Sequence, residues 1–330
     1  MTKKIPLTIK TADFISLFYN MPFMVQVETT TFCNLNCPMC EHSYSSTKSK
    51  NMSFETFEKL HKEFTSILGK KLIIYNLTGT GENLMNKDFL KMLNLCSKSS
   101  LFTYFTNNFT LLNQDVAKKF IQMRVDRVFI SFDGATKETY EKMRVGAKFE
   151  KVLDNLINLI KTKKQLKSKK PEIIMRFVPT KENIEELGEL IDLAKKTGVN
   201  QIDIPQFYVF EENKHLKVDD KTLNKALKST KEKADKLGIS LIIKEQKPLP
   251  VNLCKRGKYS CYVTVDGEVI PCCILAQSSD FSKNKKSYSF GNINEKSLKK
   301  IWNSKKYKDF RKDMVNGIKP EKCKHCSLFY

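Results

Sequence analysis

Short apolar segments rich in β-forming residues alternate with amphipathic segments through the first two thirds of this 330-residue chain. A strand followed by a helix, repeated about six times, predicts parallel βαβ units in one sheet. Because a complete barrel has eight units, we expect an open, partial (β/α)6 TIM barrel of the α/β class. The expected strands are Phe23–Val27, Leu72–Leu77, Phe102–Phe105, Val128–Phe132, Glu172–Val178 and Gln201–Ile204, and the expected helices are Phe54–Leu68, Lys87–Cys96, Gln114–Met123, Lys137–Lys142, Phe149–Lys161 and Ile184–Lys196.

Three cysteines follow the first expected strand with the spacing CxxxCxxC: Cys33, Cys37 and Cys40. Four thiolates ligate a cubane iron–sulfur cluster in full, so three leave one iron open to a small molecule. The motif therefore predicts chemistry at a cluster rather than electron storage alone. It lies at the carboxyl end of the first strand, which is where parallel α/β proteins bind their ligands.

Zinc and disulfides are the alternatives for these cysteines. A zinc site usually has four ligands, often in CxxC pairs, and His42 is close enough in sequence to be a fourth ligand. Disulfides suit a short secreted chain, whereas residues 1–10 lead into no apolar core long enough for a signal peptide. Ten cysteines without an export signal indicate a reducing compartment, so we expect a cytoplasmic location. The sequence contains no run of about 18 apolar residues, so it predicts no membrane-spanning helix.

The chain is strongly basic, with a formal net charge of +22, which raises the possibility of nucleic-acid binding. Only six of the 58 basic residues are arginine, and the lysines are spread over almost every polar segment. Because base readout and phosphate forks favour arginine, we expect a solvated lysine surface and no nucleic-acid site. Such a surface could still attract an acidic substrate or partner.

A glycine-containing loop, Thr78-Gly79-Thr80-Gly81-Glu82-Asn83, follows the second expected strand. Glycines allow a backbone to approach a ligand closely, and a carboxylate can accept hydrogen bonds from an ammonium group. Turns of this composition are common, so the loop alone is a weak signal.

Polar residues also follow the next two strands. Asn107 comes after the third strand, within Thr106-Asn107-Asn108, and Ser131 and Asp133 come after the fourth. Arg144 follows the next helix. Helix capping, or the covering of a helix end by Arg144, is the alternative to ligand binding at these positions.

The remaining cysteines, apart from Cys96, gather after residue 250, where regular apolar periodicity is poor. Metal ligation would stabilise such a region. A hairpin predicted around Asp266-Gly267 would bring Cys254 near Cys272, and the terminal CxxC would supply the last two of four ligands. Four thiolates suit zinc or an iron–sulfur cluster equally well. Cys96, on an apolar helical face, is expected to be a core residue.

The segment Glu28-Thr-Thr-Thr-Phe-Cys-Asn-Leu-Asn-Cys-Pro-Met-Cys resembles the signature of the radical S-adenosylmethionine (SAM) enzymes. The resemblance implies that SAM binds the open iron of a [4Fe-4S] cluster and is cleaved to a 5′-deoxyadenosyl radical that removes hydrogen from a substrate carbon. The strand-end loops resemble the family's cofactor loops in the same order, although Asn83 replaces a usual proline and Asn108 a usual glycine. Asn108 tolerates left-handed geometry, so we expect that turn to survive. The residues implied to bind the cofactor are Gly79, Gly81, Glu82, Asn107, Ser131, Asp133 and Arg144.

The C-terminal pattern Cys254-x12-Gly267-x4-Cys272, with Cys323-x2-Cys326, resembles the SPASM/twitch extension of radical SAM enzymes. This resemblance implies one auxiliary [4Fe-4S] cluster, ligated by Cys254, Cys272, Cys323 and Cys326, with Cys261 and Cys273 as possible substitutes. The expected organisation is an N-terminal extension at 1–22, the partial barrel at 23–215, a connecting helix and strand at 216–250 and the cluster domain, a small cysteine-rich α+β domain, at 251–330.

The resemblance also implies an external one-electron reductant, such as flavodoxin or ferredoxin, and a peptide or small-molecule substrate. The short segment before the first strand leaves no room for a leader-binding domain, which disfavours a self-contained peptide maturase. No acid–base residue is assigned: Asp203 is a candidate, with helix capping or solvation as the alternative. A second hypothesis is a non-catalytic zinc or iron–sulfur protein that contacts nucleic acid, and the glycine–glutamate loop argues against it.

Overall fold

The computed structural model describes residues 20–44, 49–67, 74–99, 101–244, 248–276, 285–324 and 326. The chain divides into two compact units. The first unit comprises residues 1–32, 46–104 and 248–330, and the second comprises residues 33–45 and 105–247.

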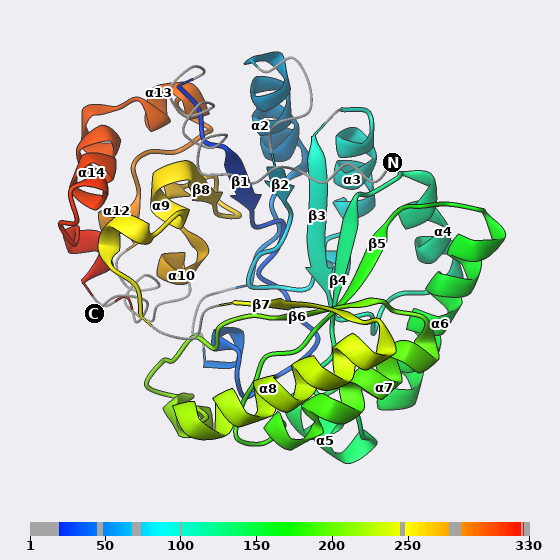
Figure 1. The fold of residues 1–330 in the computed structure, drawn as a ribbon. Helices are drawn as coiled ribbons and strands as arrows, with labels where there is room; N and C mark the ends of the chain where they lie inside the picture. The colour runs from blue at the N-terminus through cyan, green and yellow to red at the C-terminus, as the bar shows by residue number, and fades with distance from the viewer. Residues whose placement is uncertain are drawn as a thin grey trace. The chain divides into compact units, whose positions relative to one another are not determined.

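The sheet of the first unit has the order β3-β2-β1-β8-β9 (Figure 1). Three of these strands are parallel to one another: β1 (Met24–Val27), β2 (Ile74–Asn76) and β8 (Ser260–Val263). Strand β3 (Phe102–Asn107) also pairs with β2 in parallel through its first residues, and its later residues belong to the second unit. Strand β9 (Val269–Ile270) forms the predicted antiparallel hairpin with β8, and Gly267 in the turn has φ = +84°. Sequence reasoning missed one pairing: β8 lies directly beside β1.

Helices of the first unit cover this sheet through amphipathic faces. In α2 (Phe54–Ile67), Phe57, Leu60 and Phe64 recur at helical spacing and are fully buried. Cys96 lies on the buried face of α3 (Phe89–Ser97), which confirms it as a core residue. The shorter elements are η2 (Asn83–Met85), η5 (Val251–Leu253), α9 (Arg256–Tyr259), α10 (Cys273–Ala276), α12 (Lys285–Tyr288), α13 (Leu298–Trp302), α14 (Lys305–Val315) and η6 (Glu321–Cys323).

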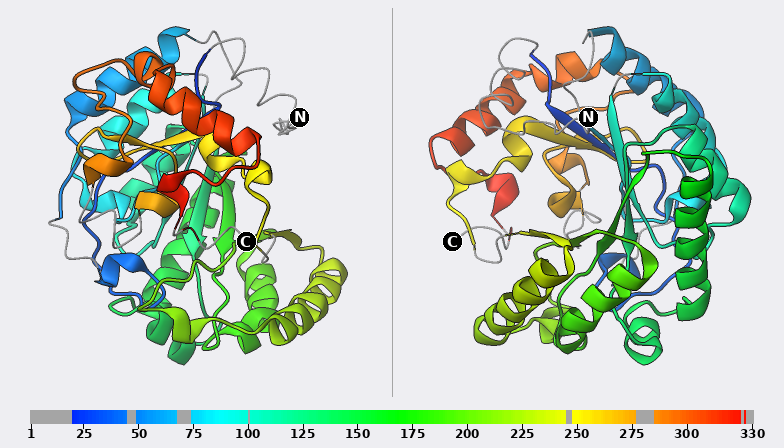
Figure 2. Two further views of the ribbon diagram at one scale, coloured as in Figure 1. Left: turned by 90° about the vertical axis from the view of Figure 1, so that its left-hand side faces the viewer. Right: turned by 45° about the vertical axis from the view of Figure 1, so that its right-hand side comes forward.

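The second unit has parallel strands in the order β7-β6-β5-β4. Strands β4 (Arg127–Ser131), β5 (Glu172–Arg176) and β6 (Gln201–Ile204) match expected strands, and β7 (Ser240–Ile243) extends the sheet beyond them. Successive helices contact one another in the order α4 (Gln114–Gln122), α6 (Phe149–Gln165), α7 (Leu187–Thr197) and α8 (Asp220–Leu237), as the views in Figure 2 also show. The remaining elements are α5 (Lys137–Met143), η1 (Glu41–Tyr44), η3 (Ile184–Glu186) and η4 (Lys214–Leu216).

Local capping residues explain where these helices begin and end. The side chains of Asn113, Thr136 and Asp219 each accept a hydrogen bond from a backbone N–H in the first turn of α4, α5 and α8. Gly198 and Gly238 end α7 and α8 with φ values of +85° and +70°, a conformation that glycine adopts without strain.

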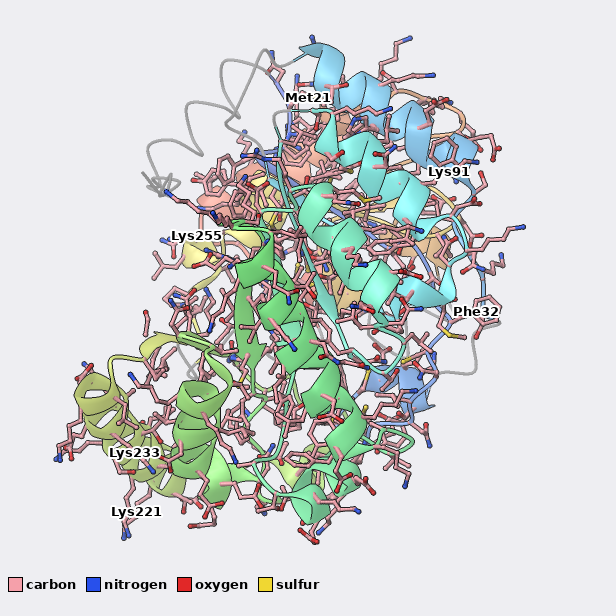
Figure 3. All side chains as sticks on the ribbon, turned by 90° about the vertical axis from the view of Figure 1, so that its right-hand side faces the viewer. Met21, Phe32, Lys91, Lys221, Lys233 and Lys255 are labelled. Carbon is pink, nitrogen blue, oxygen red and sulfur yellow. The ribbon has the colours of Figure 1, made fainter. Side chains whose placement is uncertain are left out.

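The lysines lie at the surface, as the composition predicted. Lys221 and Lys233 project from α8 into solvent in Figure 3. Lys233 pairs with the exposed Asp192 of α7 at 2.5 Å. Among the described residues, no helix is long and apolar enough to cross a membrane.

Candidate functional site

The cysteine loop of the second unit follows β1 in sequence and is fixed by polar side chains. The side-chain amide of Asn34 donates to the Thr110 hydroxyl at 2.8 Å, and that of Asn108 donates to Asn34 Oδ1 at 3.1 Å. The backbone N–H of Asn36 donates to the Val145 carbonyl at 2.9 Å. These bonds join the cysteine loop to the loop after β3 and to the segment after α5.

The three thiols of this loop lie in a desolvated environment. Cys37 is buried, and Cys33 and Cys40 are half-buried. Burial raises the pKa of Cys37, although the nearby Arg144 guanidinium partly offsets the rise. Burial, together with the neighbouring Cys37 thiol, raises the pKa of Cys40 to about 12. The charge of Cys33 adds to this rise, so both other thiols of the motif are near enough to Cys40 to disfavour its ionisation.

Arg144 lies between a buried carboxylate and a cysteine of this loop. Its Nε donates to Asp133 Oδ2 at 2.5 Å, and its Nη1 donates to Cys37 Sγ at 3.8 Å. Asp133 is fully buried, and its other oxygen accepts from the Val178 N–H at 2.6 Å. Burial alone would lower the Arg144 pKa, but the charge of Asp133 outweighs it and the pKa is raised. Asp133 therefore orients Arg144, and both oxygens of its carboxylate already accept hydrogen bonds.

The glycine loop of the first unit packs directly against the segment that precedes Cys33. The N–H groups of Gly81 and Glu82 donate to the carbonyl oxygens of Thr30 and Phe32 at 3.2 and 2.7 Å. A Cβ at Gly81 would lie 2.4 Å from the Phe32 carbonyl oxygen, so no larger residue fits without movement of the backbone. Glu82 is buried and caps η2 by accepting from the Leu84 N–H at 3.3 Å.

Two further residues that were predicted to bind the cofactor, Asn107 and Ser131, are the last residues of β3 and β4. Asn107 Oδ1 accepts from the Phe109 N–H at 2.8 Å, which forms a turn after β3. Ser131 is buried at the last position of β4. Asn108 is not the left-handed residue of this turn. Phe109 has φ = +59° instead, because Asn108 Oδ1 accepts from the N–H and hydroxyl of Thr110 and holds the turn one residue later.

The four predicted auxiliary ligands line one small cavity of the first unit: Cys254, Cys272, Cys323 and Cys326. Apolar side chains complete the lining, among them Leu275, Phe310 and Met314. An apolar shell of this kind excludes water from a metal centre and tunes its potential. Burial and the neighbouring Cys326 and Cys254 thiols raise the pKa of Cys323 to about 12. The donor set and the dry lining fit an iron–sulfur cluster.

The two possible substitute ligands lie outside this lining. Cys261 is buried within β8, and Cys273 accepts a hydrogen bond from Arg256 Nη1 at 3.3 Å. Arg256 itself lines the cavity, so it places a positive charge beside the four thiols. Among the described residues, no group of three or more His, Cys, Asp or Glu side chains is arranged to hold a single metal ion.

Asp203 is neither solvated nor a helix cap, which corrects the expectation for this candidate. It is buried in β6 and pairs with Arg176 Nε at 2.7 Å. Arg176 also donates to the Thr106 hydroxyl at 2.8 Å and stacks on the Phe129 ring at 3.9 Å. The Asp203 carboxylate is therefore engaged by Arg176 and serves to hold that guanidinium in place.

Comparison with known proteins decides the family. Residues 27–194 match the sequence model described as the radical SAM superfamily, and residues 254–327 match the SPASM model, an iron–sulfur cluster-binding domain. The chain belongs to the radical SAM superfamily. It is therefore an enzyme that uses [4Fe-4S] clusters and SAM. This result replaces the hypothesis of a non-catalytic nucleic-acid-binding protein.

Curated relatives match most of this radical SAM chain. One is the tungsten-containing aldehyde ferredoxin oxidoreductase cofactor-modifying protein of Pyrococcus furiosus, which is 28% identical over 92% of this chain and 86% of its own length. Another is the AdoMet-dependent heme synthase of Methanosarcina barkeri, which is 25% identical over 86% of this chain and 82% of its own.

Solved structures support the fold. SuiB of Streptococcus suis bound to SAM superposes with a TM-score of 0.73 and 15% identity, covering 97% of this chain and 74% of that one. The structure of anSMEcpe with bound AdoMet superposes with a TM-score of 0.68 and 22% identity, covering 93% of this chain and 83% of that one. The mostly parallel α/β sheet with a C-terminal SPASM domain confirms the predicted partial barrel. Enzymes of this family act on small-molecule or peptide substrates.

Sequence reasoning did not single out two side chains that hold the predicted loops. Glu28 follows β1 and reaches the glycine loop, and Asn213 of the second unit contacts the cysteine loop. Both are buried polar residues. A polar residue that directly follows a buried strand was the available signal for Glu28, whereas the long sequence separation left no signal for Asn213.

Proposed function

We propose that this radical SAM enzyme removes a hydrogen atom from a small molecule of the kind modified in cofactor assembly, and that one auxiliary cluster takes up the second electron. The observation that carries the proposal is the convergence of four cysteines on one dry cavity, in a chain whose first strand leads into CxxxCxxC. The chain thus has two separate sets of cysteines, each able to hold a cluster. Two clusters suit an oxidation in which one electron initiates the reaction and a second electron leaves the substrate.

Cys33, Cys37 and Cys40 are the proposed ligands of the first cluster. A [4Fe-4S] cluster held by these thiolates would supply the electron for reductive cleavage of SAM, the chemistry that removes hydrogen from the substrate. Arg144, oriented by Asp133, contributes a positive charge beside Cys37 and can bind the SAM carboxylate.

The glycine loop and the polar strand ends are the proposed contacts of SAM. Gly79, Gly81 and Glu82 suit the amino group, because the loop offers a carboxylate and a closely approachable backbone. The hydroxyl of Ser131 and the amide of Asn107 suit the nucleoside. In the auxiliary domain, Cys254, Cys272, Cys323 and Cys326 are the proposed ligands, and Arg256 beside them favours uptake of an electron.

A small-molecule substrate is favoured over a peptide by the extent of the matches. The cofactor-modifying protein and the heme synthase align with most of this chain and of their own length. The mycofactocin maturase MftC aligns with 54% of this chain and 43% of its own length. We also propose an acidic one-electron donor such as flavodoxin or ferredoxin, which the net charge of +22 would attract. All ten cysteines are free thiols, which fits a cytoplasmic location.

The test is anaerobic reconstitution with iron and sulfide, followed by reduction in the presence of SAM. We expect 5′-deoxyadenosine from the wild-type chain, none from Cys33→Ala, Cys37→Ala or Cys40→Ala, and some uncoupled cleavage from Cys323→Ala and Cys326→Ala. Absence of 5′-deoxyadenosine from wild-type protein with a loaded first cluster would refute the proposal.

Adjacent cysteines provide a matched control for the auxiliary site. Cys272 lines the cavity, whereas its neighbour Cys273 does not. Cys272→Ala should therefore lower the iron content by about four atoms, the content of one cubane cluster, while Cys273→Ala retains it. Equal loss of iron in both variants would contradict the ligand assignment.

A further inference from the structure

Glu28 is a buried carboxylate that accepts hydrogen bonds from two different parts of the first unit. It directly follows β1, and only 5% of its surface is exposed. Its Oε1 accepts from the Thr80 hydroxyl at 2.6 Å, from the Thr80 N–H at 3.3 Å and from the Tyr262 hydroxyl at 2.8 Å. Its Oε2 accepts from the Val265 N–H at 3.3 Å. All four partners donate, as an ionised carboxylate requires.

One side of this network fixes the glycine loop. Thr80 lies between Gly79 and Gly81 and gives both its N–H and its hydroxyl to Glu28. A Cβ at Gly79 would lie 2.7 Å from Glu28 Cγ, so the loop rests directly on this side chain. The conformation of the loop therefore depends on Glu28 through both packing and charge-assisted hydrogen bonds.

The other side of the network belongs to the auxiliary domain. Tyr262 lies in β8, is buried, and directs its hydroxyl to Glu28. Val265 follows β8 in the hairpin. The backbone N–H of Glu28 also donates to the Val263 carbonyl at 2.9 Å. Glu28 is thus held by the strand that leads to the auxiliary hairpin, within the region that matches the SPASM domain.

Packing alone does not explain an acidic residue here. A buried charge is costly unless every hydrogen-bonding site is used, and an apolar side chain would fill the space without that cost. The carboxylate contributes two properties that an apolar group lacks: it joins donors from the loop and from the auxiliary domain, and it places negative charge beside a loop that also carries Glu82.

We propose that Glu28 is a positioning residue that holds the Gly79–Glu82 loop in the conformation that receives the cationic amino and sulfonium groups of SAM, and that joins this loop to β8 of the auxiliary domain. The inference rests on the proposed assignment of the loop to SAM. It gives a role to Glu28, which lies at the start of the signature segment but is neither a cluster ligand nor part of the glycine loop, and it predicts that a change in β8 affects SAM binding.

The test compares Glu28→Gln, Thr80→Val and Tyr262→Phe in the reconstituted enzyme, with KM for SAM from 5′-deoxyadenosine formation and hydrogen–deuterium exchange of the loop amides. We expect Glu28→Gln to raise this KM about tenfold, the equivalent of about one lost charged hydrogen bond, and to speed exchange at residues 79–82. Iron content should stay at the wild-type value. Asp266→Asn, which removes a half-exposed carboxylate paired with Lys50, is the charge control and should change neither quantity.

Double variants separate a shared network from independent defects. If Glu28 joins the two sides, Thr80→Val and Tyr262→Phe each raise KM for SAM, and neither adds further to the effect of Glu28→Gln. If Glu28→Gln fails to fold, the pair Thr80→Val and Tyr262→Phe carries the same test. Wild-type KM and wild-type exchange in an active, iron-loaded Glu28→Gln enzyme would overturn the inference. Failure of wild-type protein to form 5′-deoxyadenosine would instead overturn the proposed function.

Discussion

Asn213 donates its side-chain amide to the carbonyl oxygen of Met39, which directly precedes Cys40, at 3.2 Å. The same amide donates to the Tyr208 carbonyl at 3.1 Å, and Asn213 Oδ1 accepts from the Phe210 N–H at 2.7 Å. The side chain is completely buried. One asparagine therefore ties the loop after β6 to the turn that carries two proposed cluster ligands.

Asn213→Leu keeps the size of this side chain and leaves the backbone groups of Met39, Tyr208 and Phe210 without these bonds. We expect the free energy of unfolding to fall by about 2 kcal/mol or more, since each buried unsatisfied group costs about 1–3 kcal/mol. Urea unfolding measures this loss, and the iron content of the reconstituted protein reports the fit of the cysteine turn. Asn213→Asp keeps the acceptor for Phe210 but turns a second carboxylate oxygen towards two carbonyl oxygens, so it should lose at least as much. A wild-type iron content and stability in Asn213→Leu would contradict the proposed role.

Gly81 tests how tightly the glycine loop must approach its neighbours. A methyl group there would meet the carbonyl oxygens of Phe32 and Thr30 at 2.4 and 2.6 Å, so Gly81→Ala must move backbone. We expect the KM for SAM to rise at least tenfold and the stability to fall by about 1–3 kcal/mol. Measurements of 5′-deoxyadenosine formation and thermal unfolding would show both effects.

Gly188 provides the matched control for this glycine substitution. It lies in α7, and a Cβ there would meet no atom within 4 Å. Gly188→Ala should therefore stabilise the protein by about 0.5–1 kcal/mol, because alanine favours the helix, and should leave the KM for SAM unchanged. Similar effects of the two substitutions would show that the glycine loop is not held closely.

The sequence predicted the elements of this fold well because their signals are local. The amphipathic spacing of Phe57, Leu60 and Phe64 and the hairpin at Gly267 both act over a few residues, and each matched the structure. The pairing of β8 with β1 is different, since the two strands are separated by more than 200 residues and no local pattern encodes the pairing. Strand β7 was expected as part of the connecting segment 216–250, but its pairing with β6 was not predicted.

The candidate site shows the same division. The family resemblance, together with a hairpin and a CxxC that limit where the sulfurs can lie, grouped Cys254, Cys272, Cys323 and Cys326, and all four line one cavity. The left-handed residue after β3 was assigned to Asn108 by intrinsic preference, yet hydrogen bonds to Thr110 moved it to Phe109. Partners that are distant in sequence, such as Tyr262 for Glu28, had no sequence signal.

Asp203 and Arg176 form an ion pair whose carboxylate is buried and whose guanidinium is partly exposed. Asp203→Asn leaves Arg176 without its charge partner, so we expect a loss of about 2 kcal/mol in unfolding free energy. The exposed pair of Asp192 and Lys233 is the control, and Asp192→Asn should cost no more than about 0.5 kcal/mol. Equal losses in urea unfolding would show that burial does not strengthen the pair.

The same Asp203 variant tests the acid–base assignment. Because the Asp203 carboxylate is engaged by Arg176, the pH profile of substrate turnover should keep its wild-type shape in Asp203→Asn, even if the rate falls. Loss of an ionisation from that profile would instead identify Asp203 as a proton acceptor.

His61 makes the stability of the first unit sensitive to acid. It is buried between Phe57 and Tyr75, with ring centroids at 6.2 and 5.9 Å, and its Nδ1 has no hydrogen-bond partner among the described residues. Burial lowers its pKa from 6.5 to about 4. Below pH 6.5 the unfolded chain binds a proton that the folded chain rejects, so stability is lost as the pH falls from about 6.5 towards 4. At pH 5 this loss amounts to about 2 kcal/mol.

His61→Phe keeps an aromatic ring and should remove that part of the pH dependence in urea unfolding between pH 7.5 and 5, whereas His215→Gln, at an exposed position, should not. An unchanged slope in His61→Phe would mean that His61 is protonated within the fold.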